Sequence, residues 1–586
     1  MQPLNSQRRK RQSFLHGAFI LTISMILVKF IGAMFKIPLT WIITEEGLGY
    51  FNTAYHFYSP IHSLATAGFP IAIARMVSEN LACGRYHDVR RIHKISIPIF
   101  LLTGGLGLAV MAVSAPFYVR AIGNGGALPA MLCLAPAILF SCLSSVYRGY
   151  YEGMSNMYPT AISEVIEALF KLLVGLSAAY LVFRIGMGEF ENFGTVWGQA
   201  VSSEAYAKSV LLPYTAAAAV FGVTIGSFMS FFYLWIRHKK KGDGIVYCEL
   251  QCAPPVTGKN IIVKRLIKMA IPIGIGALAV NVAALVDTTF LQTRIHHILA
   301  VDPDRLLNMY HGMIPDLEVK MATATVSNFL FGCYSEALAL FMLVPGITQA
   351  FGISALPSVT SAWMSGSRNQ LQKSISSVLR MTALFSIPAG MGLSVMSGSI
   401  TQAVFGAKIS APITSRTLAI MGIAAIFASL STPIFSILQA VGRVDLPVKL
   451  LCIGLGLKIG FNYVLTGIPE INILGAGIGT LICYFFITVS SCFFLCRETR
   501  ISLGFHGVFT KPIIASMFCC VSAYFSWFGM VCIIPKSIAT GLAVLIAIII
   551  YVVSLLWLKA LCKDDILMLP KGQKLSKILE KHHLIV

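Results

Sequence analysis

Three ionisable residues lie on one face of a predicted membrane helix at 159–184. Glu164, Glu167 and Lys171 occupy positions i, i+3 and i+7, which places them in a single stripe. A charge at the bilayer centre costs roughly 2.5 to 3.5 kcal/mol even on the most permissive insertion scales, so the stripe must face protein or water. Carboxylates there can carry protons, and a lysine can hold an anion. The alternative is a local ion pair between Glu167 and Lys171, which are spaced i, i+4.

Further ionisable side chains fall inside predicted spans in both halves of the chain. Burying such groups in hydrocarbon is expensive, so their recurrence favours a hydrated cavity over incidental placement. We predict that the cationic members, together with one amide, contact an anionic substrate: Lys29, Lys36, Lys171, Lys458 and Asn462. We predict that the acidic members couple transport to an ion or tune the cavity: Glu164, Glu167, Asp287 and Glu336.

The chain that must position these residues is strongly apolar. Of its 586 residues 56% are hydrophobic and 12% are charged, and the mean hydropathy of +0.78 lies outside the soluble globular range. Apolar runs of about 20 residues, the length that crosses a bilayer, recur throughout. They predict an all-α membrane protein with about 14 transmembrane helices: 14–36, 49–73, 95–117, 127–149, 159–184, 210–236, 266–291, 328–356, 374–399, 414–440, 447–467, 473–496, 511–533 and 537–560.

Basic residues concentrate on one predicted side of the membrane. The formal net charge is +21, and with the amino terminus inside roughly 32 of the Lys and Arg residues fall in cytoplasmic segments. This bias follows the positive-inside rule, so it predicts a multi-pass protein of the cell membrane with both termini cytoplasmic. It also argues against nucleic acid as a partner, because membrane orientation accounts for the basicity.

Several chemistries lack the residues that they need. The 14 cysteines are scattered without a paired metal-ligand spacing, so neither a metal site nor disulfides are predicted. The sequence TGKN at 257–260 lacks the leading glycine and the closing Ser or Thr of a phosphate-binding loop. We therefore expect no cofactor and no enzymatic activity. Transport would be driven by a proton gradient, a sodium gradient or the membrane potential.

An internal repeat divides the spans into two similar halves. Matching residues recur at a separation of roughly 290 positions: Pro70 with Pro357, Gly153 with Gly442, Pro159 with Pro447 and Lys171 with Lys458. Six spans form the repeating unit. An even number of spans returns the chain to its starting side, so the two copies are predicted to be parallel.

The repeat predicts two six-helix lobes followed by two extra helices. The predicted divisions are an N-lobe with spans 1 to 6 at 1–236, a cytoplasmic linker at 237–265, a C-lobe with spans 7 to 12 at 266–496, and spans 13 and 14 with a basic cytoplasmic tail at 497–586. Residues 294–327 have no counterpart in the first half and are interpreted as an extracellular insertion.

Several stretches resemble one transporter family over nearly the whole chain. They are KFIGAMFKIPLT, EEGLGYFNTAY, GFPIAIARMVSEN, YRGYYEGMSNMYPTAISEVIEALFKLL, IPIGIGALAVNVAALVDTTF, SIPAGMGLSVMSGSITQAVFG, ILQAVGRVDLPVK and LKIGFNYVLTGIPEINILGAGIGTLICYFF. The family is the polysaccharide-transport branch of the MOP exporter superfamily, which includes flippases of the stage V sporulation protein B-like and MurJ-like types.

The resemblance implies a V-shaped pair of lobes that carries a lipid-pyrophosphate-linked oligosaccharide, a cell-wall or polysaccharide precursor such as lipid II, to the outer leaflet. Membrane lipids and cell-wall synthesis proteins are the implied partners. Lys29 and Lys36 occupy basic positions thought to meet the pyrophosphate in such flippases, Lys171 matches a basic position of the fifth span, and Asp287 matches an acidic position of the seventh. Glu336 departs from the family pattern, in which a small residue usually stands there.

Two other functions stay open. A multidrug/cation antiporter of the related multidrug-extrusion branch would bind cations through the acidic residues and would need few lysines in its cavity. A membrane glycosyltransferase or ligase would place catalytic carboxylates in an extracytoplasmic loop, and a solvated polar loop is the simpler explanation of such residues here. The insertion carries four of them: Asp302, Asp304, Asp316 and Glu318.

Overall fold

The computed structural model describes residues 14–558 and 560, except 67, 246, 252, 444 and 502–505. Residues 1–13 and the basic tail from 561 onward, both predicted to be cytoplasmic, lie outside the described residues.

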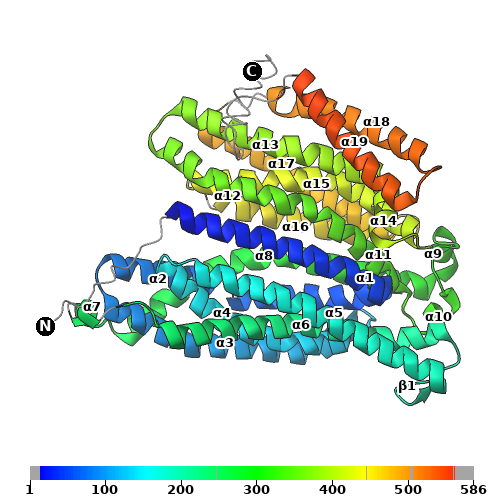
Figure 1. The fold of residues 1–586 in the computed structure, drawn as a ribbon, viewed down its shortest axis with the longest axis horizontal. Helices are drawn as coiled ribbons and strands as arrows, with labels where there is room; N and C mark the ends of the chain where they lie inside the picture. Colours follow the sequence, from blue (N-terminus) through cyan, green and yellow to red (C-terminus); the bar gives the residue numbers. More distant parts are fainter. Residues whose placement is uncertain are drawn as a thin grey trace. The chain divides into compact units, whose positions relative to one another are not determined.

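The described chain is almost entirely helical, which confirms the predicted all-α class (Figure 1). The first helices are α1 (Phe14–Thr66), α2 (Gly68–Ala82), α3 (Tyr86–Ala121), α4 (Leu128–Gly153), α5 (Tyr158–Phe193), α6 (Glu204–Lys241) and α7 (Tyr247–Gln251), with a 3-10 turn at Gly125–Ala127. They are followed by α8 (Lys259–Val301), α9 (Pro303–Met309), α10 (Leu317–Ala322), α11 (Val326–Phe341), α12 (Leu343–Met364), α13 (Arg368–Val395), α14 (Ser397–Phe405), α15 (Ala411–Ala440), α16 (Asp445–Leu465), α17 (Ile473–Thr499), α18 (Lys511–Met530) and α19 (Lys536–Trp557), with a π-helical turn at His506–Thr510. Strands β1 (Thr195–Val196) and β2 (Gln199–Ala200) pair antiparallel between α5 and α6.

Twelve of the described helical segments are long and apolar enough to cross a membrane. One of them, Ile23–Ala82, contains the later part of the first predicted span and all of the second. The predicted seventh span falls in α8, which is not among the twelve. The prediction of about 14 spans is therefore compatible with this count without being established by it. The chain is a multi-pass membrane protein.

Helix α1 is too long to cross a membrane once. Its 53 residues would extend about 80 Å at the helical rise per residue, whereas a hydrocarbon core is about 30 Å thick. The helix is interrupted at Thr44, whose φ of 56° and ψ of −172° are not helical. In Figure 1 the dark-blue first part of α1 leads away from the end of the bundle at which α2 lies, and the chain returns to that end. The break thus lets α1 supply two passes.

Contacts divide the chain into two compact units. The first unit comprises Met1–Thr288 and Glu318–Phe329, and the second comprises Thr289–Leu317 and Leu330–Val586. The division into two six-helix lobes and two extra helices stays a prediction.

Two helices continue beyond the borders that hydropathy predicts. Helix α6 extends to Lys241, past the start of the predicted linker at 237, and α8 extends to Val301, past the start of the predicted insertion at 294. Hydropathy detects the apolar part of a helix, whereas backbone hydrogen bonds continue into its polar flanks.

In the first unit, α5 and α6 approach each other closely at two glycines. A Cβ atom on Gly226 would lie 2.5 Å from the carbonyl oxygen of Glu167, and one on Gly222 would lie 3.0 Å from that of Lys171. Small residues four apart are the usual means by which membrane helices pack backbone to backbone. The two glycines therefore place α6 against the turns of α5 that carry the predicted site residues.

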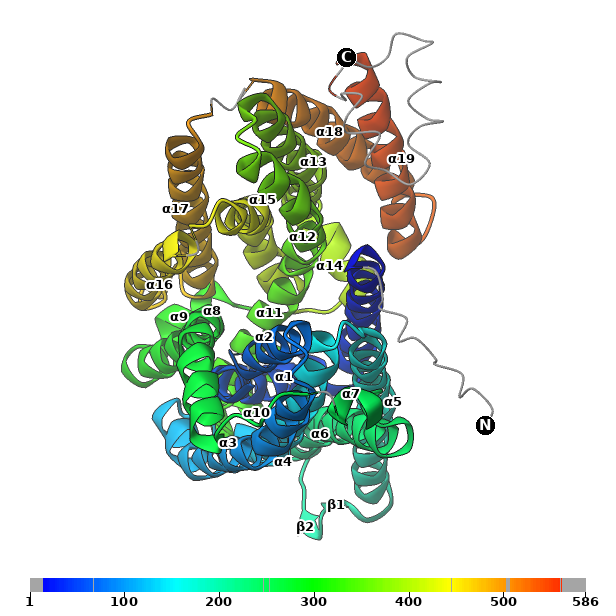
Figure 2. The ribbon, with the colours of Figure 1, turned by 90° about the vertical axis from the view of Figure 1, so that its left-hand side faces the viewer.

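In the second unit, α15 packs against α12, α13 and α17. The last two helices are tied to this group, since Tyr551 Oη of α19 donates to Leu384 O of α13 at 2.7 Å. Trp527 Nε1 of α18 donates to Thr540 Oγ1 of α19 at 3.2 Å. Figure 2 shows α18 and α19 side by side next to α13.

Asp243 fastens the start of the linker to α3. Its carboxylate accepts from Arg90 Nε at 2.5 Å and from Arg90 Nη2 at 3.1 Å, and it accepts from the Ile245 N–H at 3.0 Å. Burial favours the neutral carboxyl, but these hydrogen bonds more than offset it and hold the pKa of Asp243 below its usual value.

We expect Asp243→Asn to lower the free energy of unfolding at pH 7 by about 1 kcal/mol, because Arg90 loses a charged partner. A depressed carboxyl pKa contributes stability that is fully present above the unfolded value of about 3.9 and is lost as the pH falls through the folded value. The difference between variant and wild type should therefore be smaller at about pH 3 than at pH 7. Thermal unfolding of the purified protein in detergent at both pH values measures it, and a pH-independent difference would contradict this account.

Candidate functional site

Arg148, near the end of α4, holds Glu167 of α5 in an ion pair. Arg148 Nη2 lies 2.8 Å from Glu167 Oε2, and the guanidinium also donates to Ser163 Oγ at 2.9 Å and to Ser230 Oγ at 2.8 Å. Ser227 Oγ donates to the other oxygen of Glu167 at 3.1 Å. Side chains from α4, α5 and α6 thus satisfy both charges, as burial of an ion pair within membrane spans requires.

Lys171 is held by aromatic rings. Its ammonium lies 5.1 Å from the centroid of the Phe35 ring and 5.3 Å from that of the Tyr55 ring, both on α1. Cation–π contacts stabilise an ammonium group without neutralising its charge. Among the described residues Glu167 pairs with Arg148, and the local Glu167–Lys171 ion pair considered from the sequence is not formed.

Lys36 places a second ammonium group near Lys171. Lys36 directly follows Phe35, is half-buried, and repels Lys171 electrostatically. Within the described part of the chain, neither ammonium has a carboxylate at ion-pair distance. Two like charges held together in membrane spans create a positive potential that an anion would neutralise.

A row of aromatic rings on α1 supports Lys171. Phe51 lies between Phe35 and Tyr55, with ring centroids 5.9 Å and 6.2 Å apart, and it is nearly parallel to Tyr55. The row continues through Tyr58 to His62, whose ring stacks on that of Tyr58 at 5.0 Å. These rings form a packed wall that fixes one side of the Lys171 surroundings.

Glu164 lies where α1 packs against α5. Ser24 Oγ of α1 lies 2.9 Å from Ala161 O and 3.4 Å from Glu164 Oε2, so its hydroxyl can donate to either oxygen. Glu164 is half-buried, whereas Lys29 is exposed. The first unit therefore brings Lys36 close to Lys171, whereas Lys29 is exposed on α1.

Asp287 is buried on α8, with 2% of its surface exposed. Around it α8 is attached to the second part of α1. Thr288 Oγ1 lies 2.7 Å from His56 Nδ1, and Ser59 Oγ donates to Asn281 Oδ1 at 2.6 Å. Asp287 is thus buried on the stretch of α8 that is hydrogen-bonded to α1.

In the second unit, Glu336 of α11 has a counter-ion of its own. The residue is 1% exposed, Lys408 Nζ lies 3.4 Å from Oε1, and Thr414 Oγ1 donates to Oε2 at 2.9 Å. The carboxylate that departs from the family pattern is therefore matched by a cation from the segment between α14 and α15. Among the described residues, no group of three His, Cys, Asp or Glu side chains is placed to hold a metal ion.

Lys458 and Asn462 lie one turn apart on α16 and are 5% and 0% exposed. Thr466 Oγ1 donates to the Asn462 carbonyl oxygen at 2.5 Å. On the following residue, Tyr463, the guanidinium of Arg294 lies 4.5 Å from the ring centroid. Lys458 and Asn462 are covered by protein within the second unit, and Lys36 and Lys171 belong to the first.

The predicted insertion is partly packed. Lys320 of α10 is 8% exposed, and its Nζ lies 3.6 Å from Glu46 Oε2 and 5.3 Å from the centroid of the Phe329 ring. Asn328 Nδ2 donates to the Glu46 carbonyl oxygen at 2.7 Å. These contacts attach α10 and the start of α11 to α1 just beyond the break at Thr44. The composition of the insertion does not indicate such a role.

Sequence reasoning missed Arg148. The residue stands at the end of the predicted span 127–149, where a cation is usually an interface anchor. It lies 19 positions before Glu167, and no helical spacing connects two residues on different helices. The available signal was the presence of opposite charges in neighbouring spans.

Two family models match separate parts of the chain. A model described as "Polysaccharide biosynthesis protein" matches residues 14–297, and one described as "MatE" matches residues 325–464. The curated lipid II flippase MurJ of Bacillus subtilis (strain 168) is 25% identical over 483 residues, which cover 79% of this chain and 78% of that protein. Stage V sporulation protein B of the same organism is 26% identical over 239 residues, 39% of this chain and 40% of that protein. The resemblance to the MOP exporter superfamily is confirmed.

Solved structures of this superfamily share the fold. A structure of lipid II flippase MurJ in an inward closed conformation matches with a TM-score of 0.59 and 15% identity, covering 92% of this chain and 98% of that one. An inward-facing multidrug resistance MATE family transporter of the MOP superfamily matches with a TM-score of 0.57 and 10% identity, covering 83% and 99%. Both likenesses concern the fold.

We expect Arg148→Met to lower the free energy of unfolding by about 1 to 3 kcal/mol, because it leaves the Glu167 carboxylate without its cation. The two side chains are 19% and 31% exposed, so the loss should be smaller than for a fully buried pair. Adding Glu167→Leu should recover part of the loss, since the unpaired charge is removed. A double-mutant cycle by thermal unfolding in detergent measures the coupling. Additive effects of the two substitutions would show that the pair contributes nothing.

Proposed function

We propose that the protein is a flippase for a lipid-pyrophosphate-linked oligosaccharide, a cell-wall or polysaccharide precursor such as lipid II. It would move this substrate across the cytoplasmic membrane by alternating access and would catalyse no covalent chemistry. The proposal is supported by the likeness to the relative named lipid II flippase MurJ and by the polysaccharide biosynthesis family match.

The observation that carries the proposal is the Lys36–Lys171 pair. The protein neutralises Glu167 with Arg148, yet it leaves two nearby ammonium groups without a carboxylate in the described chain. A diphosphate brings at least two negative charges and several acceptor oxygens, so it can bridge both lysines. Lys29, on the same helix, would contact the head group during entry, and Lys458 with Asn462 would contact it at another stage of the cycle.

Orientation and partners follow from the same proposal. The positive-inside bias supports cytoplasmic termini, and with that orientation the substrate would be taken from the inner leaflet of the cell membrane. Membrane lipids surround the spans, and enzymes of cell-wall synthesis would supply and consume the substrate.

Coupling would rest on the carboxylates. Glu336, buried beside Lys408, can exchange its ion pair for a proton or a sodium ion. Glu164, Glu167 and Asp287 would tune the electrostatics of the first unit. Proton or sodium binding, or the membrane potential, would then bias the transport cycle.

A multidrug/cation antiporter is the second candidate, and the MATE structural match favours it. In that function the carboxylates would bind the cationic substrate. The pairing of Glu167 with Arg148 counts against this, because that carboxylate already has a cation.

Lys171→Gln should lower flipping of a labelled lipid-linked oligosaccharide in reconstituted vesicles by at least about tenfold, since a charged hydrogen bond to phosphate is lost. Lys171→Arg is the matched control and should retain most of the activity, because it keeps the positive charge. Lys36→Gln should behave like Lys171→Gln. Intact flipping together with lost export of a cationic drug would favour the antiporter instead.

Glu336→Gln should abolish the dependence of flipping on an imposed proton or sodium gradient while leaving gradient-free equilibration measurable. The amide keeps the hydrogen bond from Thr414 and removes the ionisable group. Flipping rates in vesicles with and without each gradient test this, with Thr414→Val as a control that leaves the carboxylate in place. An unchanged gradient dependence in Glu336→Gln would remove this residue from the coupling mechanism.

A further inference from the structure

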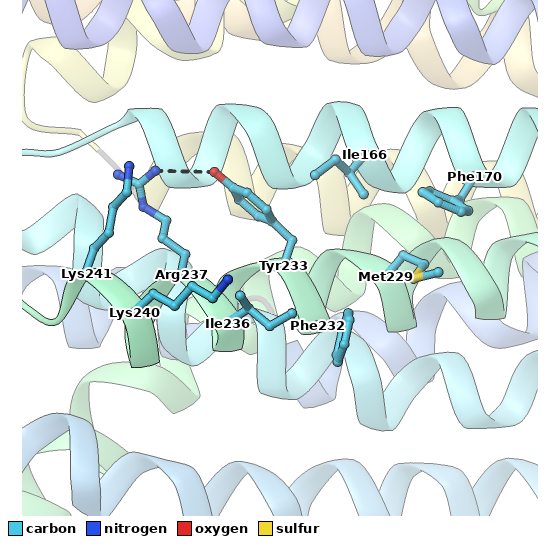
Figure 3. A pocket seen from close by; sticks show the side chains of 9 residues that line it. All are labelled: Ile166, Phe170, Met229, Phe232, Tyr233, Ile236, Arg237, Lys240 and Lys241. Atoms are coloured by element: carbon cyan, nitrogen blue, oxygen red, sulfur yellow. Dashed lines mark hydrogen bonds between the residues drawn. The ribbon is translucent and has the colours of Figure 1, made fainter.

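A groove of about 460 Å³ lies between α5 and α6 in the first unit, away from the residues used above (Figure 3). Its lining divides by chemistry along its length. The apolar part is formed by Ile166, Phe170, Met229, Phe232 and Ile236, and the polar end by Tyr233, Arg237, Lys240 and Lys241.

The basic end of the groove has an excess of positive charge. Lys240 and Lys241 are exposed and, within the described residues, have no carboxylate at ion-pair distance. Arg237 Nη1 donates to Tyr233 Oη at 3.3 Å, and its guanidinium lies 5.8 Å from the centroid of the Tyr151 ring. Both partners are neutral, so the groove ends in three cations that an anion would neutralise.

The length of the groove fits one leaflet of a bilayer. Positions 229 to 240 of α6 span about 16 Å at the helical rise, close to half of a hydrocarbon core of about 30 Å. Beside the basic end, the Trp235 ring stacks on Phe232 with centroids 6.1 Å apart, and the Lys239 ammonium lies 5.2 Å from the Trp235 centroid. Tryptophan with lysine marks the membrane–water interface. The cations therefore lie at head-group level and the apolar part reaches into the hydrocarbon.

The groove is separate from the proposed substrate contacts. Ile166 directly precedes Glu167, and Phe170 directly precedes Lys171. Successive side chains of an α-helix point about 100° apart around its axis, so the groove residues do not share a face of α5 with the residues that follow them. The groove lining also contains no acidic side chain and little polar surface away from its basic end. A glycan-bearing head group needs a hydrated, hydrogen-bonding wall, which this lining does not offer.

We propose that this groove binds one anionic diacyl phospholipid of the surrounding membrane. Its acyl chains lie along Ile166, Phe170, Met229 and Phe232, and its phosphate contacts Arg237, Lys240 and Lys241. Basic pockets between membrane helices are suited to anionic head groups, because charge attraction adds to apolar burial. In the proposed orientation the site belongs to the cytoplasmic leaflet.

The test compares phosphatidylglycerol with phosphatidylcholine on the purified full-length protein. Bound lipid is counted by native mass spectrometry during titration with dioleoyl forms of each. The wild type should retain phosphatidylglycerol in preference to phosphatidylcholine. Lys240→Gln with Lys241→Gln should weaken phosphatidylglycerol retention about five- to thirtyfold and leave phosphatidylcholine unchanged.

The matched control is Lys239→Gln with Lys94→Gln, which removes the same charge from exposed lysines that do not line the groove. It should retain phosphatidylglycerol like the wild type. If both double variants lost phosphatidylglycerol retention equally, the loss would be due to net charge alone, and the proposal would be overturned. All four substitutions are at exposed positions, so a folding defect is not expected, and gel filtration checks for one.

A second arm tests the apolar part and the identity of the lipid. Met229→Trp, which fills the middle of the groove, should also lower phosphatidylglycerol retention although every lysine is kept. A photoreactive phosphatidylglycerol should crosslink to residues of the groove lining. Crosslinking there by a photoreactive polyprenyl pyrophosphate, with none by phosphatidylglycerol, would assign the groove to the transported lipid and overturn the proposal.

Discussion

An ionised carboxylate survives inside membrane spans only where donors surround it, and this constraint organises the first unit. Glu167 is satisfied by Arg148 of α4 and Ser227 of α6, while Ser230 of α6 holds the guanidinium. These serines reach the pair because Gly226 lets α6 approach the backbone of α5 at Glu167. Charge compensation at Glu167 therefore depends on the close packing of the two backbones. A side chain at Gly226 would separate the serine donors from the carboxylate.

Three carboxylates of this protein have cationic partners, whereas Lys36 and Lys171 have no carboxylate partner among the described residues. Glu167, Glu336 and Glu46 each have a cationic partner, from Arg148, Lys408 and Lys320. Lys171 is instead supported by two aromatic rings, and among the described residues neither Lys171 nor Lys36 has a carboxylate at ion-pair distance. An arrangement that satisfies its anions internally and keeps cations available suits an anionic substrate better than a cationic one, which is why the flippase proposal is preferred to the antiporter.

Much of the fold could be predicted because the bilayer imposes a length on every span. Apolar runs of the right length located the helices, and the repeat of matching residues suggested two similar halves. The extents of α6 and α8 could not be predicted, since hydropathy ends where the hydrocarbon ends and helical hydrogen bonding does not. The ion pair between Lys320 of α10 and Glu46 could not be predicted either, because the residue pattern of a short polar helix does not indicate which helix it packs against.

The sequence by itself determined that Glu164, Glu167 and Lys171 share a face of one membrane helix, because that depends only on the 3.6-residue period and on the cost of charge in lipid. Only the tertiary structure decided their partners. Arg148 forms an ion pair with Glu167, and the rings of Phe35 and Tyr55 contact the ammonium of Lys171. These partners lie on other helices, whose positions beside α5 depend on close packing at glycines and serines. The helical period determines which side chains share one face of a helix. Ion pairing between helices depends instead on the distance between them, and residue spacing along the chain does not determine that distance.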